Sequence, residues 1–109
     1  MRPTMARTTP VITREIRESI CDLARTCGIS RVIVFGSRAR GDNHERSDID
    51  LAIEGGDTAA FSCDVDYEVP TLLMFDVVDL ERPVSPDLLA SIEREGIEIY
   101  HKPATDGTA

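Results

Sequence analysis

The segment from Asp48 to Ile53 constrains the fold most strongly, because its side chains alternate with a period of two. Acidic or small residues and apolar residues follow one another in the order Asp48, Ile49, Asp50, Leu51, Ala52 and Ile53. This alternation is typical of a β-strand with one buried face, since successive side chains of a strand point to opposite sides. The pattern therefore predicts that the carboxylates of Asp48 and Asp50 lie on the same face of a strand.

The residues before this strand predict a helix, a buried strand and a turn. Apolar residues recur every three or four positions from Thr13 to Thr26, which indicates an amphipathic helix, and Gly28 is suited to end it. The apolar run Arg31–Phe35 predicts a buried strand. We expect Ser37–Gly41 to open a short helix.

The residues after it predict two more strands and a helix. Residues 57–70 are acidic and lack a clear period, whereas Thr71–Leu80 is rich in Leu, Val and Phe and predicts a strand. Ser85 is a good helix cap with a proline after it, and Gly96 is suited to close that helix. Ile97–Tyr100 predicts the last strand. This order predicts an α+β fold, a small mixed β-sheet with helices packed on one face.

Length and composition indicate one globular domain. The chain has 109 residues, of which 41% are hydrophobic and 29% charged, which leaves room for a single modest core. We expect a domain over residues 11–102, a disordered N-terminal tail at 1–10 and a C-terminal tail at 103–109. No apolar run approaches the roughly 20 residues that cross a membrane, and residues 1–10 do not resemble a secretory signal. The three cysteines lack metal-binding spacing, so we expect reduced thiols and a cytoplasmic location.

The charge balance excludes some partners. Twenty acidic residues against twelve basic ones give a net charge of −8, which would repel a nucleic-acid duplex because affinity for its backbone comes mainly from Lys and Arg. A local basic stretch, with Arg38, Arg40 and Arg46, matches a small anion such as a triphosphate. The sequence predicts no membrane partner and leaves self-association open.

Two carboxylates on one face of a strand need compensation. At a separation of about 5 Å and an effective dielectric constant near 20, they repel each other by about 3 kcal/mol. A divalent cation removes this repulsion, and Mg²⁺ favours one or two carboxylates together with substrate phosphates. The alternative is that Asp48 and Asp50 form the solvated face of an edge strand.

Gly36 and Ser37 lie where the buried strand turns into the short helix. Backbone N–H groups at such a turn form an anion site, and glycine lets the backbone approach a phosphate closely. The Ser37 hydroxyl and the guanidinium groups of Arg38 and Arg40 are candidates for further contacts. Taken alone, Arg38 and Arg46 are more typical of solvated surface. The turn and the acid pair together predict a site for a metal-bound nucleoside triphosphate.

The run Gly-Ser-Arg-Ala-Arg-Gly at 36–41, followed by Ser-Asp-Ile-Asp-Leu at 47–51, resembles the minimal nucleotidyltransferase (MNT) family of the DNA polymerase β-like nucleotidyltransferase superfamily. The signature of that superfamily is Gly-Ser followed by Asp-x-Asp. Here ten residues, 38–47, separate Ser37 from Asp48. The resemblance extends from about Ile12 to Lys102 and implies the nucleotidyltransferase fold.

The resemblance also implies the site residues. The nucleotide-binding positions would be Gly36, Ser37, Arg40 and Ser47. The catalytic and metal-binding residues would be Asp48, Asp50 and a third carboxylate on the following strand. Asp76 and Asp79 are both available there, and their three-residue spacing puts them on opposite faces. We select Asp76, because it lies inside the apolar run and matches the place of the third acid in the family.

The activity implied is Mg²⁺-dependent transfer of a nucleoside monophosphate, AMP from ATP, to a hydroxyl group. Asp48 and Asp50 would hold two Mg²⁺ ions, and Asp76 would ligate the second ion and help to remove the hydroxyl proton. The family includes antitoxins that pair with helical HEPN-type toxins, and some of these modify the partner by adding AMP. This makes a protein adenylyltransferase that acts as an antitoxin the leading hypothesis.

Two alternatives remain open at this point. One is a non-catalytic antitoxin, a binding subunit that neutralises a HEPN partner by contact alone. The other is transfer to a small molecule such as an aminoglycoside, which usually requires an additional domain. Templated polymerisation is disfavoured because the chain is short and acidic.

Overall fold

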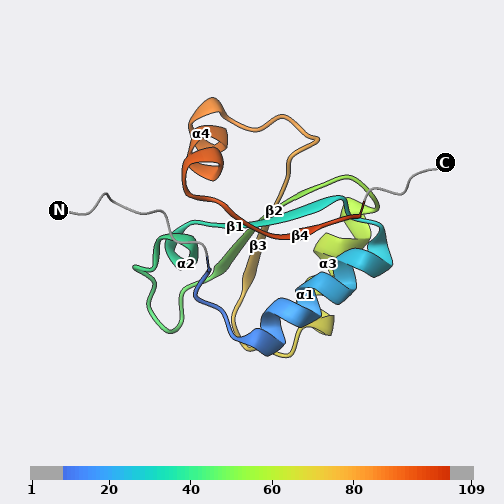
Figure 1. Cartoon of the computed structure of the whole chain (residues 1–109), viewed down its shortest axis with the longest axis horizontal. Coiled ribbons are helices and arrows are strands. Elements are labelled where there is room, and N and C mark those ends of the chain that lie inside the picture. The colour runs from blue at the N-terminus through green and yellow to red at the C-terminus, as the bar shows by residue number, and fades with distance from the viewer. Residues whose placement is uncertain (1–8, 104–109) are drawn as a thin grey trace.

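The fold is described from a computed structural model of the chain, in which residues 9–103 are described. These residues form a four-stranded sheet and four helices (Figure 1). In chain order the elements are α1 (Arg14–Cys27), β1 (Arg31–Phe35), α2 (Ser37–Arg40), β2 (Ile49–Glu54), α3 (Thr58–Glu68), β3 (Phe75–Asp79), α4 (Pro86–Glu95) and β4 (Ile97–His101).

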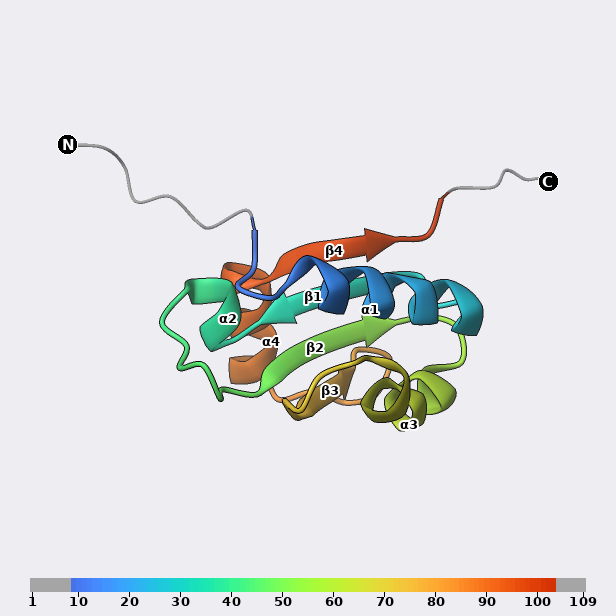
Figure 2. The ribbon, with the colours of Figure 1, turned by 90° about the horizontal axis from the view of Figure 1, so that it is seen from below.

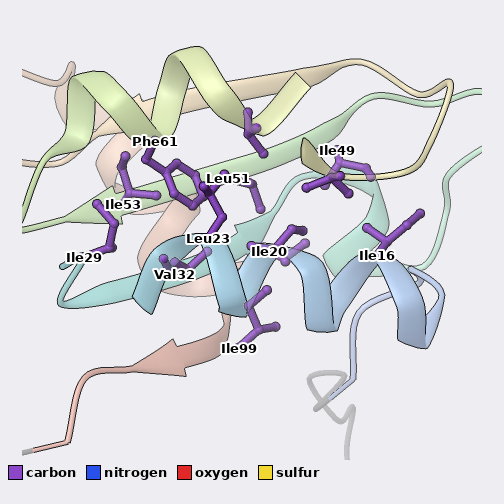
Figure 3. Packing of buried hydrophobic residues seen from close by; sticks show 14 of the residues in the cluster. Ile16, Ile20, Leu23, Ile29, Val32, Ile49, Leu51, Ile53, Phe61 and Ile99 are labelled. Atoms are coloured by element: carbon purple, nitrogen blue, oxygen red, sulfur yellow. The ribbon is translucent and has the colours of Figure 1, made fainter. Parts of the chain in front are cut away.

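Helix α1 is capped at both ends, and its C-terminal cap, Gly28, is the one that the sequence predicts. The Thr13 hydroxyl accepts a hydrogen bond from the Ile16 backbone N–H (3.2 Å), and Gly28 ends the helix with φ of 71°, a value that favours glycine. The apolar stripe of α1 is buried against the sheet, where Ile16, Ile20 and Leu23 point toward the strands (Figure 3). This stripe fixes α1 across one face of the sheet.

The sheet is mixed, with strand order β3-β2-β1-β4 (Figure 2). Strand β1 pairs antiparallel with both β2 and β4, whereas β2 and β3 are parallel and are joined through α3. A parallel pair needs such a crossover, because its second strand must start at the same end as the first. The first residues of β2 and β3 therefore lie together at one end of the sheet, beside the last residue of β1.

Helices cover both faces of the sheet. Helices α1 and α3 pack on one face and α4 lies on the other (Figure 1). The larger core includes Ile49, Leu51, Ile53 and Phe61, and the smaller one consists of Ile33, Phe35, Ala52 and Ile92. The predicted α+β class and mixed sheet are confirmed. The expected layer of helices is formed by α1 and α3, whereas α4 covers the opposite face because its apolar stripe, which includes Ile92, packs on Ile33 and Ala52.

Strand β3 and helix α3 differ from the elements that the sequence predicts. The strand predicted over Thr71–Leu80 begins only at Phe75, because Leu72 and Met74 are exposed and have no layer to pack against. The segment without a clear period contains helix α3, which begins after the Asp57 cap. Only Phe61 and Val65 of α3 are buried, so the helix leaves little periodic signal in the sequence.

The tails expected at 1–10 and 103–109 fall almost wholly outside the described residues. Pro10, which is described, is buried. Within residues 9–103 no helix is long and apolar enough to cross a membrane. Cys21, Cys27 and Cys63 are free thiols, as the sequence predicts.

Substituting Phe61 tests how α3 is held to the sheet. Phe61→Ala is expected to lower the free energy of unfolding by about 3–5 kcal/mol, because it removes a fully buried ring from the larger core. Urea denaturation measures this loss. Tyr67→Ala is the matched control on the same helix, since Tyr67 is exposed, and it should change stability by less than about 0.5 kcal/mol.

Candidate active site

Asp50 and Asp76 are direct neighbours on adjacent strands. They are register partners in the parallel pair of β2 and β3, so their side chains leave the sheet on the same face. This is the face of Ala52 and α4, because Ile49 and Leu51 on either side of Asp50 point into the larger core. Asp50 is half-buried and Asp76 is exposed. The sheet register thus brings together two of the three acids that the sequence selects.

The Gly36 turn adjoins the Asp50 carboxylate. Phe35, the last residue of β1, is the register partner of Asp50, so the chain turns into α2 directly beside it. Gly36 has φ of 75°, and a Cβ at this position would overlap Oδ2 of Asp50. Both the backbone angle and the close approach of the carboxylate therefore require glycine. The turn and the acid pair form one continuous site.

Negative charge accumulates at this site. Burial raises the pKa of the Asp50 carboxyl above its usual value, the carboxylates of Asp76 and Asp48 raise it further, and the Arg40 guanidinium partly opposes them. Two neighbouring carboxylates thus act on Asp50, and the Arg40 guanidinium opposes them. Such a site is electrostatically suited to bind a cation.

Asp48 lies just before β2 and is exposed, so its carboxylate is not held against the sheet. Among residues 9–103 no three acid, His or Cys side chains converge closely enough to form a ready-made metal cage. The donor set nevertheless fits Mg²⁺, which takes one or two carboxylates and completes its octahedron with water and substrate phosphates. Asp50 and Asp76, which are register partners, supply two such carboxylates.

Asp79 takes part in a different structure. Its Oδ2 accepts a hydrogen bond from the Thr58 hydroxyl (2.8 Å), and its Oδ1 accepts one from the Glu81 backbone N–H (2.9 Å). Asp79 pairs with Ile53, and so it lies on the face covered by α1 and α3. It fastens the start of α3 to the end of β3. The structure therefore separates Asp79 from Asp50 and Asp76.

Arg40 lies beside the acids but is engaged by other carboxylates. Its Nε donates to Oδ2 of Asp42 (3.0 Å) and its Nη1 donates to Oε1 of Glu95 on α4 (2.9 Å). Gly36 is the N-cap of α2, and Ser37 is the first residue of the helix. Ser47 lies in the loop before Asp48, where its hydroxyl accepts a hydrogen bond from the His44 backbone N–H (2.7 Å). The Ser47 hydroxyl, predicted to bind the nucleotide, thus bonds within its own loop.

Arg38 corrects an expectation from the sequence. It was expected to be solvated, but it is only 6% exposed. Its guanidinium donates to the backbone carbonyl oxygens of Ser47 (3.1 Å), Val11 (2.8 Å), His44 (3.3 Å) and Glu45 (3.1 Å). Arg38 thus holds the loop that leads into Asp48, and it is unavailable to a phosphate. Its partners are backbone oxygens, which leave no charge pattern in the sequence.

Two of the hollows in the described part of the chain lie near α4 and the start of β3. A cavity of about 430 Å³ between α4 and the sheet is lined by Arg31, Glu54 and Leu80, at the end of β2 opposite to Asp50. A cleft of about 460 Å³ is lined by Glu45, Arg46, Leu72, Leu73 and Met74, beside the start of β3. Neither hollow is predictable from the sequence, because each combines segments that are far apart in the chain.

Comparison with known proteins agrees with this geometry. The model of the family described as Polymerase beta, Nucleotidyltransferase matches residues 18–105, which include the Gly36 turn and all three acids. The chain belongs to this nucleotidyltransferase family. No protein among those with curated descriptions matches the sequence.

Solved structures give the same result. A protein assigned as a minimal nucleotidyltransferase is 33% identical, with a TM-score of 0.59, and the match covers 74% of this chain and 86% of that one. The nucleotidyltransferase family membership and the resemblance to minimal members are thus confirmed. A toxin–antitoxin crystal structure with AMP-PNP is 22% identical, with a TM-score of 0.64, covering 79% of this chain and 73% of that one. The toxin–antitoxin MntA-HepT is 18% identical, with a TM-score of 0.59, covering 83% and 74%. These last two similarities show a shared fold.

Asp50→Asn is expected to stabilise the fold while removing a site carboxylate. The pKa of Asp50 is raised, so the ionised side chain destabilises the folded state above that pKa, and the penalty disappears below the ordinary pKa of about 3.9. Urea denaturation should show a gain of up to about 1 kcal/mol at pH 7, the scale of a cross-strand pair, that shrinks toward pH 4. Glu81→Gln, an exposed control, should show no such gain. A loss of stability at pH 7 in Asp50→Asn would contradict the charge crowding.

Arg38→Met is expected to lower the free energy of unfolding by about 2–4 kcal/mol, because it removes the guanidinium that donates to several partly buried carbonyl oxygens. Hydrogen exchange should accelerate over residues 42–48. Arg46→Met is the matched control in the same loop, since Arg46 is exposed. Equal stability of the two variants would show that the Arg38 hydrogen bonds do not hold the loop.

Proposed function

We propose that this protein is a Mg²⁺-dependent adenylyltransferase that moves AMP from ATP to a hydroxyl group of a partner protein, a helical HEPN-type toxin, and thereby acts as an antitoxin. The observation that carries the proposal is the contact between the Gly36 turn and Asp50, with Asp76 as the register partner of Asp50. A phosphate-binding turn and a carboxylate pair thus meet at one end of the sheet. Family membership supports nucleotidyl transfer as the reaction class.

The proposed step makes one bond and breaks one. The acceptor hydroxyl oxygen bonds to the α-phosphorus of ATP, the bond between that phosphorus and the bridging α,β-oxygen breaks, and pyrophosphate leaves. The hydroxyl proton passes to a carboxylate, for which Asp76 is our candidate, and then to water. The backbone N–H groups of the Gly36–Ser37 turn orient the phosphates, and positioning of this kind supplies much of the rate in phosphoryl transfer.

Asp48, Asp50 and Asp76 are the residues that would hold Mg²⁺. When bound, Mg²⁺ neutralises charge on the triphosphate and on the acids. Arg40 stands close enough to Asp50 to affect its pKa, and it is the cation of this chain best placed to approach a phosphate. To do so it would exchange its contacts with Asp42 and Glu95 for phosphate oxygens.

ATP and a toxin partner are supported by the similar folds. One similar structure is a toxin–antitoxin with AMP-PNP, and others are the toxin–antitoxin MntA-HepT. The chain covers 73–74% of those proteins' length.

A second candidate is a binding subunit that neutralises its partner by contact alone. The exposed position of Asp48 and the absence of a ready-made three-acid cage within residues 9–103 favour it. The two candidates make different demands on Asp50 and Asp76, because contact neutralisation does not require either carboxylate.

Asp76→Asn is expected to lower the rate of transfer at least a hundredfold, because it removes the proposed proton acceptor and a metal ligand. Transfer is measured with α-labelled ATP, Mg²⁺ and a purified HEPN-type toxin as the acceptor. Asp79→Asn is the matched control three residues along the same strand, and it should retain activity within about threefold, because an asparagine oxygen can still accept the Thr58 hydrogen bond.

The same variants separate the two candidates. If Asp76→Asn still rescues cells that express the toxin and no protein is labelled even by the wild type, the binding subunit is the correct function. Equal loss of labelling in Asp76→Asn and Asp79→Asn would overturn the choice of Asp76.

A further inference from the structure

We propose that the cleft lined by Glu45, Arg46, Leu72, Leu73 and Met74 is the docking surface for the acceptor, and that the acceptor is a protein segment with apolar side chains flanked by basic ones. This inference rests on the transfer reaction proposed above and names the substrate class of that site. We call this surface the Leu72–Met74 cleft.

The cleft adjoins the carboxylates directly. The backbone N–H of Ile49, which lies between Asp48 and Asp50, donates to the Met74 carbonyl oxygen (2.9 Å). Asp76 follows Met74 by two residues. A segment bound in the cleft would therefore lie beside the start of both β2 and β3, where the acids are.

The order of strands separates the two substrates. Across the sheet, β1 with the Gly36 turn lies on one side of Asp50, and β3 with Asp76 lies on the other (Figure 2). If the triphosphate occupies the Gly36 turn, the acceptor must approach the α-phosphate from another direction. The side of β3, which carries the Leu72–Met74 cleft, is open because β3 is an edge strand.

The cleft has apolar side chains without a partner in the described part of the chain. Leu72 is 101% exposed and Met74 is 61% exposed. Large apolar side chains this exposed, beside a hollow and a reactive site, are typical of a surface that binds another molecule. They offer no hydrogen bonds to a sugar, so they favour an acceptor with apolar groups over an aminoglycoside.

The charge around the cleft distinguishes a nucleic-acid acceptor from a protein acceptor. The lining itself holds one acid, Glu45, and one base, Arg46. The carboxylates of Asp48 and Asp76 lie beside it, at the start of β2 and β3, so acids outnumber bases around the cleft. A nucleic-acid acceptor would be repelled by this excess of acids, whereas basic residues around an apolar anchor would be attracted. A protein segment with both features matches the surface.

The test uses defined probes and two surface variants. The probes are a short peptide with serine and tyrosine hydroxyls between leucines and arginines, the same peptide with the leucines changed to serine, and a single-stranded RNA with a free 3′ hydroxyl. The variant is L72S/M74S. The matched control is Leu89→Ser, because Leu89 is an exposed large apolar residue that lies on α4, away from the Leu72–Met74 cleft. Fluorescence anisotropy measures binding, and α-labelled ATP measures transfer.

The wild type should bind the leucine peptide at least tenfold more tightly than the serine peptide or the RNA. L72S/M74S should lose this preference and label the peptide at least tenfold more slowly, while its KM for ATP stays unchanged. Leu89→Ser should behave as the wild type does. A KM for ATP that stays constant distinguishes an acceptor defect from general damage to the site.

Several results would overturn the docking surface. These are equal binding of the two peptides, binding of neither, tighter binding of RNA, or full binding by L72S/M74S. A wild-type dimer that becomes a monomer in L72S/M74S, measured by sedimentation, would assign the cleft to contact between copies of the chain. If the peptide binds through the cleft but no probe is ever labelled, the docking surface stands and the transfer activity fails.

Discussion

Burial of Ile49, Leu51 and Ile53 beneath α1 and α3 is the constraint on which the site depends. These side chains fix the register of β2, since a slip of one residue would put the acids into the apolar layer. Fixed in this way, β2 presents Asp50 to the face of α4, beside Phe35 on one neighbour and Asp76 on the other. Core packing on one face therefore specifies the arrangement of charge on the other.

Local signals gave most of the fold. The Ser85 cap, the left-handed Gly28 and the apolar run of β1 are each decided by nearby residues, and each is where the sequence predicts it. Elements that depend on distant contacts were less readable. Helix α3 has two buried residues and a weak period, and β3 is shortened because the segment that includes Leu72 finds no layer to cover it.

The site was readable to the extent that it follows from alternation and spacing. Alternation predicts Asp48 and Asp50 on one face of a strand, but β2 begins only at Ile49, so Asp48 lies just outside it. Opposite faces separate Asp76 from Asp79, as their spacing predicts, but only the register of the parallel pair brings Asp76 beside Asp50. The roles of the arginines were not readable. Arg38 and Arg40 are two residues apart in the same short helix, yet one is buried among carbonyl groups and the other spans two carboxylates.

The paired hydrogen bonds between Arg38 and Val11 extend the site beyond its own loop. The Val11 backbone N–H donates to the Arg38 carbonyl oxygen, while the Arg38 side chain donates to the Val11 carbonyl oxygen, both at 2.8 Å. The chain ahead of α1 is thereby fastened to the same guanidinium that shapes the approach to Asp48. An affinity tag or a truncation close to Pro10 would therefore loosen the loop that leads into Asp48, although the two positions are nearly forty residues apart in the sequence. The N-terminal boundary chosen for expression thus becomes a variable of any activity measurement.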